Sequence, residues 1–145
     1  ITMSRLISKK DLVDLFSKNY GEKPVSKSKW AEYYDENVIF IDPTQKRIGL
    51  QCYIQAQDNL VNRCDDIYLK THVISITENV GFVEWTMRLK IMGKEFIYPG
   101  ITRLIFSDNG KIKEHRDYFD FVGPTFGPIP LLGGFIRWIY SIFVS

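Results

Sequence analysis

The spacing of hydrophobic residues changes its period once along the chain, near residue 65. Before that point apolar side chains recur every three or four residues, which is typical of helices that bury one face. After it, apolar and polar residues alternate as far as residue 121, which is typical of strands with one buried face. The pattern therefore predicts helices first and a run of strands afterwards, the arrangement of an α+β fold.

Turn and helix-stop residues divide these two regions into elements. Gly21 and Pro24 end the first helical segment, and the turn signal Asp108-Asn109-Gly110 separates the last two strands. The predicted helices cover Asp11–Asn19, Lys27–Asp35 and Gly49–Asn62. The predicted strands cover Val38–Ile41, Ile67–Ile76, Val80–Met92, Glu95–Phe106 and Lys111–Phe121. Pro99-Gly100 predicts a bulge or bend inside the fourth of these strands.

The C-terminal segment has a different composition from the rest of the chain. We expect residues 1–122 to form the α+β domain and residues 123–145 to form an apolar flap and short helix of the same domain. Between Phe121 and Val144 the only charged residue is Arg137, and a helix is predicted over Gly134–Val144. Such a helix must be covered, either by the sheet or a second subunit, or by a membrane surface or ligand for which it acts as anchor or lid.

Composition and charge narrow the possible functions. Aromatic residues make up 14% of the chain, which favours an aromatic-lined interior or an apolar interface. The net charge is only +2, and no run of Lys and Arg predicts a nucleic-acid interface. The two histidines are far apart and no cysteines have metal-ligand spacing, so no metal and no cofactor are expected.

The two cysteines are predicted to be free thiols. Cys52 and Cys64 lie twelve residues apart on one predicted helix, a rise of about 18 Å, whereas a disulfide needs Cα atoms within about 7 Å. Free thiols fit a reducing compartment. Because residues 1–10 also lack the apolar run of a signal peptide, we expect a cytoplasmic protein.

Two patches resemble one known superfamily. The first is Val38-Ile39-Phe40-Ile41-Asp42-Pro43, followed by Gly49 and a helix, and the second runs from Gly110 to Asp120. In this order and spacing they resemble the nuclear transport factor 2-like superfamily, which includes ketosteroid isomerases, SnoaL-like polyketide cyclases, limonene-epoxide hydrolases and scytalone dehydratases. The resemblance implies a cone: a curved antiparallel sheet wrapped around helices, with a central pocket. It also implies a homodimer formed through the outer sheet face.

The resemblance also implies roles for individual residues. Asp42, directly before a proline, resembles the general base of ketosteroid isomerases, while Thr102 stands where that family has an oxyanion-binding Asp. Asp117 matches the first Asp of the RDYFD stretch of limonene-epoxide hydrolases, and with His115 it resembles the base of SnoaL-like cyclases. Trp85 and Met87 stand where the epoxide hydrolases have an Arg and a second Asp, so epoxide hydrolysis is not predicted.

Strand alternation supports an inward orientation for part of this set. His115, Asp117 and Phe119 fall on one face of their strand. The alternative for Asp42 is a turn residue at a strand end, and the alternative for His115 is a structural hydrogen bond to Asp117. The predicted catalytic residues are Asp117, Asp42 and His115. The predicted pocket-lining residues are Trp85, Met87, Tyr98, Thr102, His72, Phe119, Tyr34 and Tyr53, with His72 expected in the core beside Ile74 and Ile76.

Two functions remain open at this point. The first is a cofactor-free isomerase, cyclase or dehydratase that uses acid–base catalysis on a steroid-, polyketide- or terpenoid-like substrate. The second is a non-catalytic module that binds an apolar ligand or a partner. The expected partners are a second copy, an apolar small molecule and a membrane surface contacted weakly by the tail, and no nucleic acid.

Overall fold

One six-stranded sheet dominates the computed structural model, which describes residues 7–129 and 131–144. Residues 1–6, on which the expected absence of a signal peptide largely depends, lie outside the described residues. The helices are α1 Lys9–Leu15, α2 Lys27–Tyr33, α3 Leu50–Arg63, α4 Val122–Phe126 and α5 Leu132–Val144. The strands are β1 Tyr34–Ile41, β2 Lys46–Ile48, β3 Asp66–Thr77, β4 Val80–Ile91, β5 Lys94–Phe106 and β6 Ile112–Phe119.

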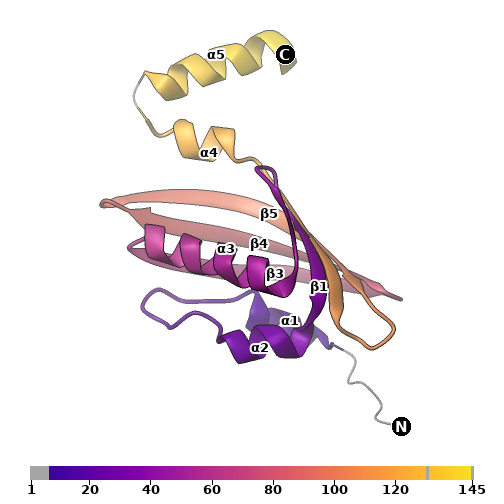
Figure 1. Ribbon diagram of the computed structural model, residues 1–145. Coiled ribbons are helices and arrows are strands. Elements are labelled where there is room, and N and C mark those ends of the chain that lie inside the picture. Colours follow the sequence, from indigo (N-terminus) through magenta and orange to yellow (C-terminus); the bar gives the residue numbers. More distant parts are fainter. Residues whose placement is uncertain (1–6, 130, 145) are drawn as a thin grey trace.

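The sheet is curved and does not close on itself. Its strand order is β2-β1-β6-β5-β4-β3, and every neighbouring pair is antiparallel except β1 and β6, which are parallel. Figure 1 shows α3 lying along the concave side of the sheet, with α1 and α2 at one end. The predicted α+β fold, a curved sheet wrapped around helices, is confirmed.

Local contacts explain where the first elements begin and end. Ser8 and Asp11 form a capping box at the start of α1, with the Asp11 amide 3.1 Å from Ser8 Oγ and the Ser8 amide 2.9 Å from Asp11 Oδ2. The helix ends at Leu15, four residues before the predicted end. The reason is that Lys18 pairs with Leu69 on the edge of β3 through two backbone hydrogen bonds of 2.8 Å.

Gly100 packs beneath an aromatic ring and does not mark a bulge. The pairing of β4 with β5 is regular through Pro99 and Gly100, so the predicted bulge there is wrong. A Cβ atom on Gly100 would lie 2.5 Å from the Trp85 ring, which explains why this strand position has no side chain. The register shifts of the sheet occur elsewhere: between Tyr34 and Ile39, between Thr71 and Val73, and between Ile105 and Phe106.

The core lies between the concave sheet face and α1, α2 and α3. Its fully buried side chains include Leu12, Tyr34, Val38, Tyr53, Val83 and Leu104. Both cysteines are free thiols: Cys52 is exposed and Cys64 is half-buried at the end of α3. Aromatic rings stack densely here, with the Tyr34 and Tyr53 ring centroids 4.7 Å apart. These packed rings set the position of the site residues described below.

The C-terminal helices project from the domain (Figure 1). Thr125 in α4 reaches the sheet through a 2.7 Å hydrogen bond with Tyr98. The next helix, α5, packs against α4 and exposes most of its apolar side chains, so of the expected covers for this helix its own sheet does not provide one. Close backbone contact between Gly127 and Gly133 turns α5 back along α4 and away from the sheet. No helix in the described ranges is long and apolar enough to cross a membrane.

Candidate functional site

A cavity of about 360 Å³ lies between α3 and the concave face of the sheet. Most of its wall is apolar and comes from the strands, including Trp85, Met87 and Phe119. We define its mouth by the exposed members of the lining, which are Thr44, Gln45, Arg63 and Phe121. The volume falls in the range of small-molecule sites, about 300–1,000 Å³.

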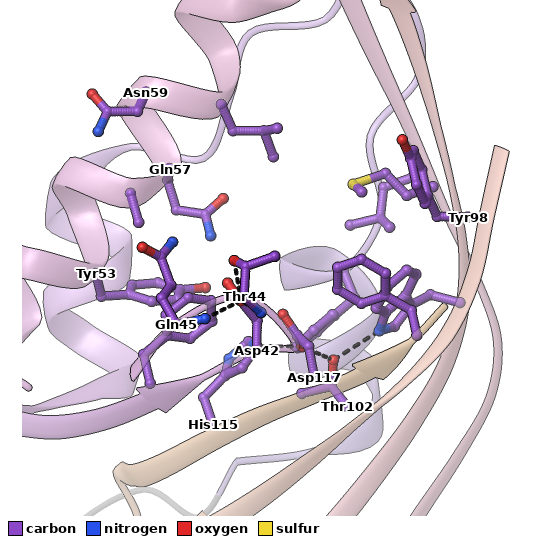
Figure 2. A pocket seen from close by; sticks show the side chains of 18 of the residues that line it. Asp42, Thr44, Gln45, Tyr53, Gln57, Asn59, Tyr98, Thr102, His115 and Asp117 are labelled. Atoms are coloured by element: carbon purple, nitrogen blue, oxygen red, sulfur yellow. Dashed lines mark hydrogen bonds and ion pairs between the residues drawn. The ribbon is translucent and has the colours of Figure 1, made fainter. Parts of the chain in front are cut away.

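Asp117 lies at the floor of this cavity, on β6, and one of its two oxygens is held by side chains from β5 and β6 (Figure 2). Oδ1 accepts a 2.5 Å hydrogen bond from Thr102 Oγ1 on β5 and lies 2.7 Å from His115 Nε2. The Thr102 hydroxyl in turn accepts a 2.7 Å hydrogen bond from Trp85 Nε1 on β4. These contacts fix the carboxylate in one orientation.

Two buried tyrosines extend the hydrogen-bond chain behind His115. Tyr34 Oη lies 2.7 Å from His115 Nδ1, and Tyr53 Oη donates to Tyr34 Oη over 3.3 Å. Burial raises the pKa of both tyrosines above its ordinary value, so both stay neutral hydroxyls. We call Trp85, Thr102, Asp117, His115, Tyr34 and Tyr53 the carboxylate network.

Counting donors and acceptors assigns the protons of this network. A carboxylate oxygen only accepts, so His115 Nε2 is the donor to Asp117 Oδ1, and with one ring proton Nδ1 is then the acceptor of the Tyr34 hydroxyl proton. Both nitrogens of His115 are therefore occupied by protein contacts, and the ring is 3% exposed. His115 orients the carboxylate and has no nitrogen free for a ligand.

The second oxygen of Asp117 has no such partner. Among the described residues none forms a hydrogen bond with Oδ2, and the side chain keeps 17% of its surface exposed in the cavity. Gln57 extends from α3 into the same cavity from the side opposite the sheet, as Figure 2 shows. Within the described part of the chain its amide makes no hydrogen bond either. A free carboxylate oxygen and a free amide thus reach the cavity from opposite walls.

Asp42 lines the cavity, but its carboxylate is occupied by its own turn. Oδ1 accepts hydrogen bonds from the Thr44 amide at 2.7 Å, the Thr44 hydroxyl at 2.6 Å and the Gln45 amide at 3.0 Å. This is the strand-end turn that the alternative interpretation of Asp42 predicted. The structure gives Asp42 a turn-forming position at the mouth, apart from the network that holds Asp117.

Most of the predicted pocket-lining residues do line the cavity, and two do not. The residues at the wall are Trp85, Met87, Tyr98, Thr102, Phe119 and Tyr53. Tyr34 is fully buried behind His115 and contributes to the network without reaching the cavity. The prediction for His72 is wrong, because the register shift between Thr71 and Val73 turns it to the exposed outer face. There its Nε2 lies 2.7 Å from Thr86 Oγ1.

The polar residues of the opposite wall were not predicted. Gln57 shares a helical face with Tyr53 and Leu60, and a polar residue on an otherwise apolar face was the available signal. Arg47 and Arg63 also line the cavity, but they lie on β2 and at the end of α3, which the sequence pattern did not connect. Among the described residues no cluster of three or more His, Cys, Asp or Glu could hold a metal ion.

Comparison with known proteins supports the fold and the family resemblance. The family model described as a SnoaL-like domain matches residues 21–115. No curated protein matches the chain significantly in sequence. A Jannaschia protein described as a SnoaL-like polyketide cyclase is 14% identical, with 94% of this chain and 91% of that one covered at a TM-score of 0.64.

Two further solved structures have the same architecture. An NTF2-like protein of unknown function from Exiguobacterium is 17% identical, covers 77% of this chain and 97% of its own, and has a TM-score of 0.62. A Catenulispora acidiphila protein with a ketosteroid isomerase-like fold, crystallised with trimethylamine, is 10% identical, covers 79% and 86%, and has a TM-score of 0.65. At these identities the likeness shows the fold, which hosts many functions, and leaves the activity to be argued from the site.

Proposed function

The chain belongs to the SnoaL-like domain family, and on that premise we propose that it is an acid–base enzyme for small apolar carbonyl compounds, with Asp117 as the proton acceptor. The observation that carries the proposal is that the two Asp117 oxygens differ in their hydrogen bonds. Oδ1 is held by His115 and Thr102, while Oδ2 has no partner among the described residues. A carboxylate with one fixed and one available oxygen is arranged to take a proton from a bound ligand.

The chemistry follows from what surrounds that oxygen. Asp117 Oδ2 removes a proton from the carbon next to the ligand's carbonyl group. The electron pair of the C–H bond forms the carbon–carbon double bond of an enolate, and the π pair of the carbonyl group moves onto its oxygen. Gln57 is suited to donate an amide hydrogen bond to this developing charge from the opposite wall. Return of the proton from Asp117 to a different carbon completes an isomerisation. In a cyclisation the enolate carbon attacks a second carbonyl carbon, and Asp117 returns the proton to the alkoxide that forms. The step needs a carboxylate and hydrogen-bond donors.

The remaining members of the network act as positioning residues. Thr102 and His115 both donate to Oδ1, so they fix the orientation of the carboxylate and leave Oδ2 available in the cavity. Tyr34 and Tyr53 keep the His115 ring in the tautomer that donates through Nε2. In this proposal His115 supports the base and does not itself exchange protons with the ligand.

The cavity wall indicates the class of ligand. Apart from Asp117, Gln57 and the hydrogen-bonded side chains of Thr102 and His115, the deep part of the wall consists mainly of aromatic and aliphatic side chains such as Trp85, Leu89 and Phe119. A compact ring system with few polar groups fits such a surface best, because each buried polar group without a partner costs about 1–3 kcal/mol. This supports a polyketide-, terpenoid- or steroid-like substrate.

Exchange of carbon-bound hydrogen with solvent tests the proposal without knowledge of the natural substrate. The probe is 2-tetralone, an apolar bicyclic ketone, and deuterium uptake next to its carbonyl is followed by NMR in D₂O. Asp117→Asn keeps an Oδ1 that can accept from His115 and Thr102 but removes the base, so the catalysed rate should fall about 10²–10⁴-fold. Asp42→Asn is the matched control, since an amide oxygen can still accept the three hydrogen bonds of its turn. Its rate should stay within a factor of about two.

The same experiment distinguishes the second candidate function, an apolar-ligand binding module. If the wild-type chain binds 2-tetralone yet exchanges its protons no faster than buffer, the base assignment for Asp117 fails. A broader panel of ketones then serves only to define the binding preference. Equal exchange rates for the wild type and Asp117→Asn contradict the proposal in the same way.

We also propose that the outer sheet face pairs with a second copy of the chain. On that side, four residues on β3, β4, β5 and β6 are paired across neighbouring strands and form a row: Val73, Glu84, Ile101 and Tyr118. Three of these side chains are exposed apolar or aromatic groups. Ile101, at 42% exposure, lies in the middle of the row. Ile101→Glu should convert a dimer to a monomer in analytical ultracentrifugation. A monomeric wild-type chain contradicts the pairing.

A further inference from the structure

The last helix, α5, carries a broad apolar surface and a narrow polar stripe. Gly134, Arg137 and Ser141 fall at positions i, i+3 and i+7, so they share one side of the helix. The other sides are apolar and strongly exposed, with exposed fractions of 55% for Phe135, 59% for Trp138, 55% for Ile142 and 82% for Phe143. This wide apolar arc has the form of an amphipathic surface helix.

Gly133 and Arg137, and not the strongly exposed apolar residues, form the contact of α5 with α4. Arg137 Nη1 donates a 3.2 Å hydrogen bond to the Gly127 carbonyl at the end of α4. Gly133 lies against the same carbonyl, so closely that a Cβ atom there would collide with it. These contacts hold α5 on α4 with the apolar arc directed outward. Within the described ranges no other helix or strand packs substantially against α5.

The helix pair lies beside the cavity mouth. Phe121 at the mouth contacts Phe126 of α4, with ring centroids 6.4 Å apart, and Tyr98 of the cavity wall hydrogen-bonds Thr125 at 2.7 Å. Figure 1 shows α4 and α5 beyond the end of the sheet at which the β1–β2 turn lies. The outward arc of α5 and the opening of the cavity are thus at the same end of the molecule.

Three basic side chains, Lys46, Arg47 and Arg63, lie at or near this end of the cavity. From Phe121 to Val144 the chain has no Asp or Glu and one Arg. Arg63 lies at the mouth, Arg47 lines the cavity, and Lys46 precedes Arg47 on β2. Of the acidic residues nearest in sequence, Asp42 is engaged by its own turn and Asp120 accepts from the Val122 and Gly123 amides at the start of α4, while Asp65 follows Arg63 by two residues. An apolar arc beside a basic rim complements an anionic lipid surface, where each nearby cation contributes about 1 kcal/mol.

We propose that α5 lies in the interface of an anionic lipid bilayer with the cavity mouth facing the lipid, so that an apolar ligand passes between bilayer and cavity without crossing bulk water. A bilayer covers an arc of more than half a helix circumference, whereas a single packed helix covers a narrower stripe. Trp138 and Tyr140 are residue types that concentrate at bilayer interfaces. The ligand part of this inference rests on the proposed function, whereas the lipid contact stands on α5 and the basic rim alone.

Vesicle flotation of the whole chain tests the lipid contact. Vesicles of phosphatidylcholine with phosphatidylglycerol should carry the protein, and phosphatidylcholine alone should carry much less. Phe135→Ser with Trp138→Ser should reduce partition at least about tenfold, since each ring loses well over one methylene equivalent of burial. Gly134→Ala with Ser141→Ala, on the polar stripe of the same helix, is the matched control and should leave partition unchanged. Arg47→Gln with Arg63→Gln should lower partition about tenfold on the anionic vesicles only.

Each alternative occupant of the arc gives a distinct result that overturns the proposal. Absence of flotation with both vesicle types excludes the lipid contact. A subunit count that falls in native mass spectrometry when Phe135 and Trp138 are replaced assigns the arc to a second copy. Weaker 2-tetralone binding by the Phe135→Ser, Trp138→Ser variant in vesicle-free buffer indicates that α5 is a lid over the cavity of its own chain. Deuterium uptake by 2-tetralone in vesicle-free buffer tests the role of Asp117 and not the lipid contact. Failure of the proposed function and failure of the lipid contact are therefore distinguishable.

Discussion

The side chains of the carboxylate network and those of helix α5 have opposite environments. In the network, polar groups are buried in an apolar core, and the described residues provide a partner for each except Asp117 Oδ2. In α5, apolar groups are exposed, and the described chain provides little cover for them. Both are unusual, because buried polar groups and exposed apolar surfaces each cost free energy.

The difference separates two kinds of evidence for function. A completed polar network holds a single geometry, and the one oxygen it leaves available identifies where a ligand is to react. An uncovered apolar helix holds no reacting group and identifies only what the molecule is to touch. The network should therefore be sensitive to small substitutions measured on the protein alone, and α5 should be sensitive only when its external partner is present.

The largest effect on stability should come from adding one methyl group in the network region. Gly100→Ala places a Cβ atom within 2.5–2.9 Å of the Trp85 ring, which its hydrogen bond to Thr102 prevents from moving freely. We expect a loss of about 3 kcal/mol in the free energy of unfolding, measured with urea. The same substitution in α5, Gly134→Ala, meets no atom within 4 Å and should be neutral or stabilising by up to about 1 kcal/mol. Equal losses at both glycines contradict the comparison.

Removing one hydroxyl from the network should have the next largest effect. Tyr34→Phe leaves His115 Nδ1 and the Tyr53 hydroxyl without their shared partner, at a cost of about 2 kcal/mol in the free energy of unfolding. The control is Tyr20→Phe, which loses an exposed 2.9 Å hydrogen bond to Glu95 and should change stability by less than about 0.5 kcal/mol. If the two variants unfold alike, the buried chain of hydroxyls does not hold His115.

The pH dependence of stability should reflect the raised pKa values of the buried tyrosines Tyr34 and Tyr53. Their pKa values are raised by burial, so in the folded chain they stay neutral above pH 10, where tyrosines of the unfolded chain ionise. Stability is therefore unaffected below about pH 10 and falls as pH rises further, by about 1.4 kcal/mol per pH unit for each such tyrosine. Urea titrations at pH 9, 10 and 11 should show a shallower decline for Tyr53→Phe than for the wild type. Parallel declines would contradict the raised pKa of Tyr53.

The smallest effect should come from α5 itself. Ile142→Ser removes an apolar side chain that is 55% exposed, so the free energy of unfolding in lipid-free buffer should change by less than about 0.5 kcal/mol. A buried isoleucine provides the contrast: Ile112→Ser, at 0% exposure, should cost several kcal/mol. A large loss for Ile142→Ser indicates that α5 is covered by protein even without lipid.

Strand and helix periodicity made most of the fold predictable. The period-two pattern from residue 67 onward located the four long strands, and the inward orientation of Asp117 and His115 followed from alternation with Phe119. The prediction for His72 failed because a register shift between Thr71 and Val73 reverses the faces, and no residue type marks that shift. Strand β2 was missed because its three residues are too few to show a period.

For the site, the sequence by itself determined which residue types were present and on which face of each element they fall. Only the tertiary structure decided which of them meet. Thr102, which looked like the loss of a catalytic acid, is instead a donor to Asp117, since β5 and β6 pair at those two residues. Gln57 and Asp117 share a cavity because α3 lies along the concave side of the sheet. Periodicity acts within one element, whereas a site is made where elements far apart in the chain come together, and that depends on packing across the whole core.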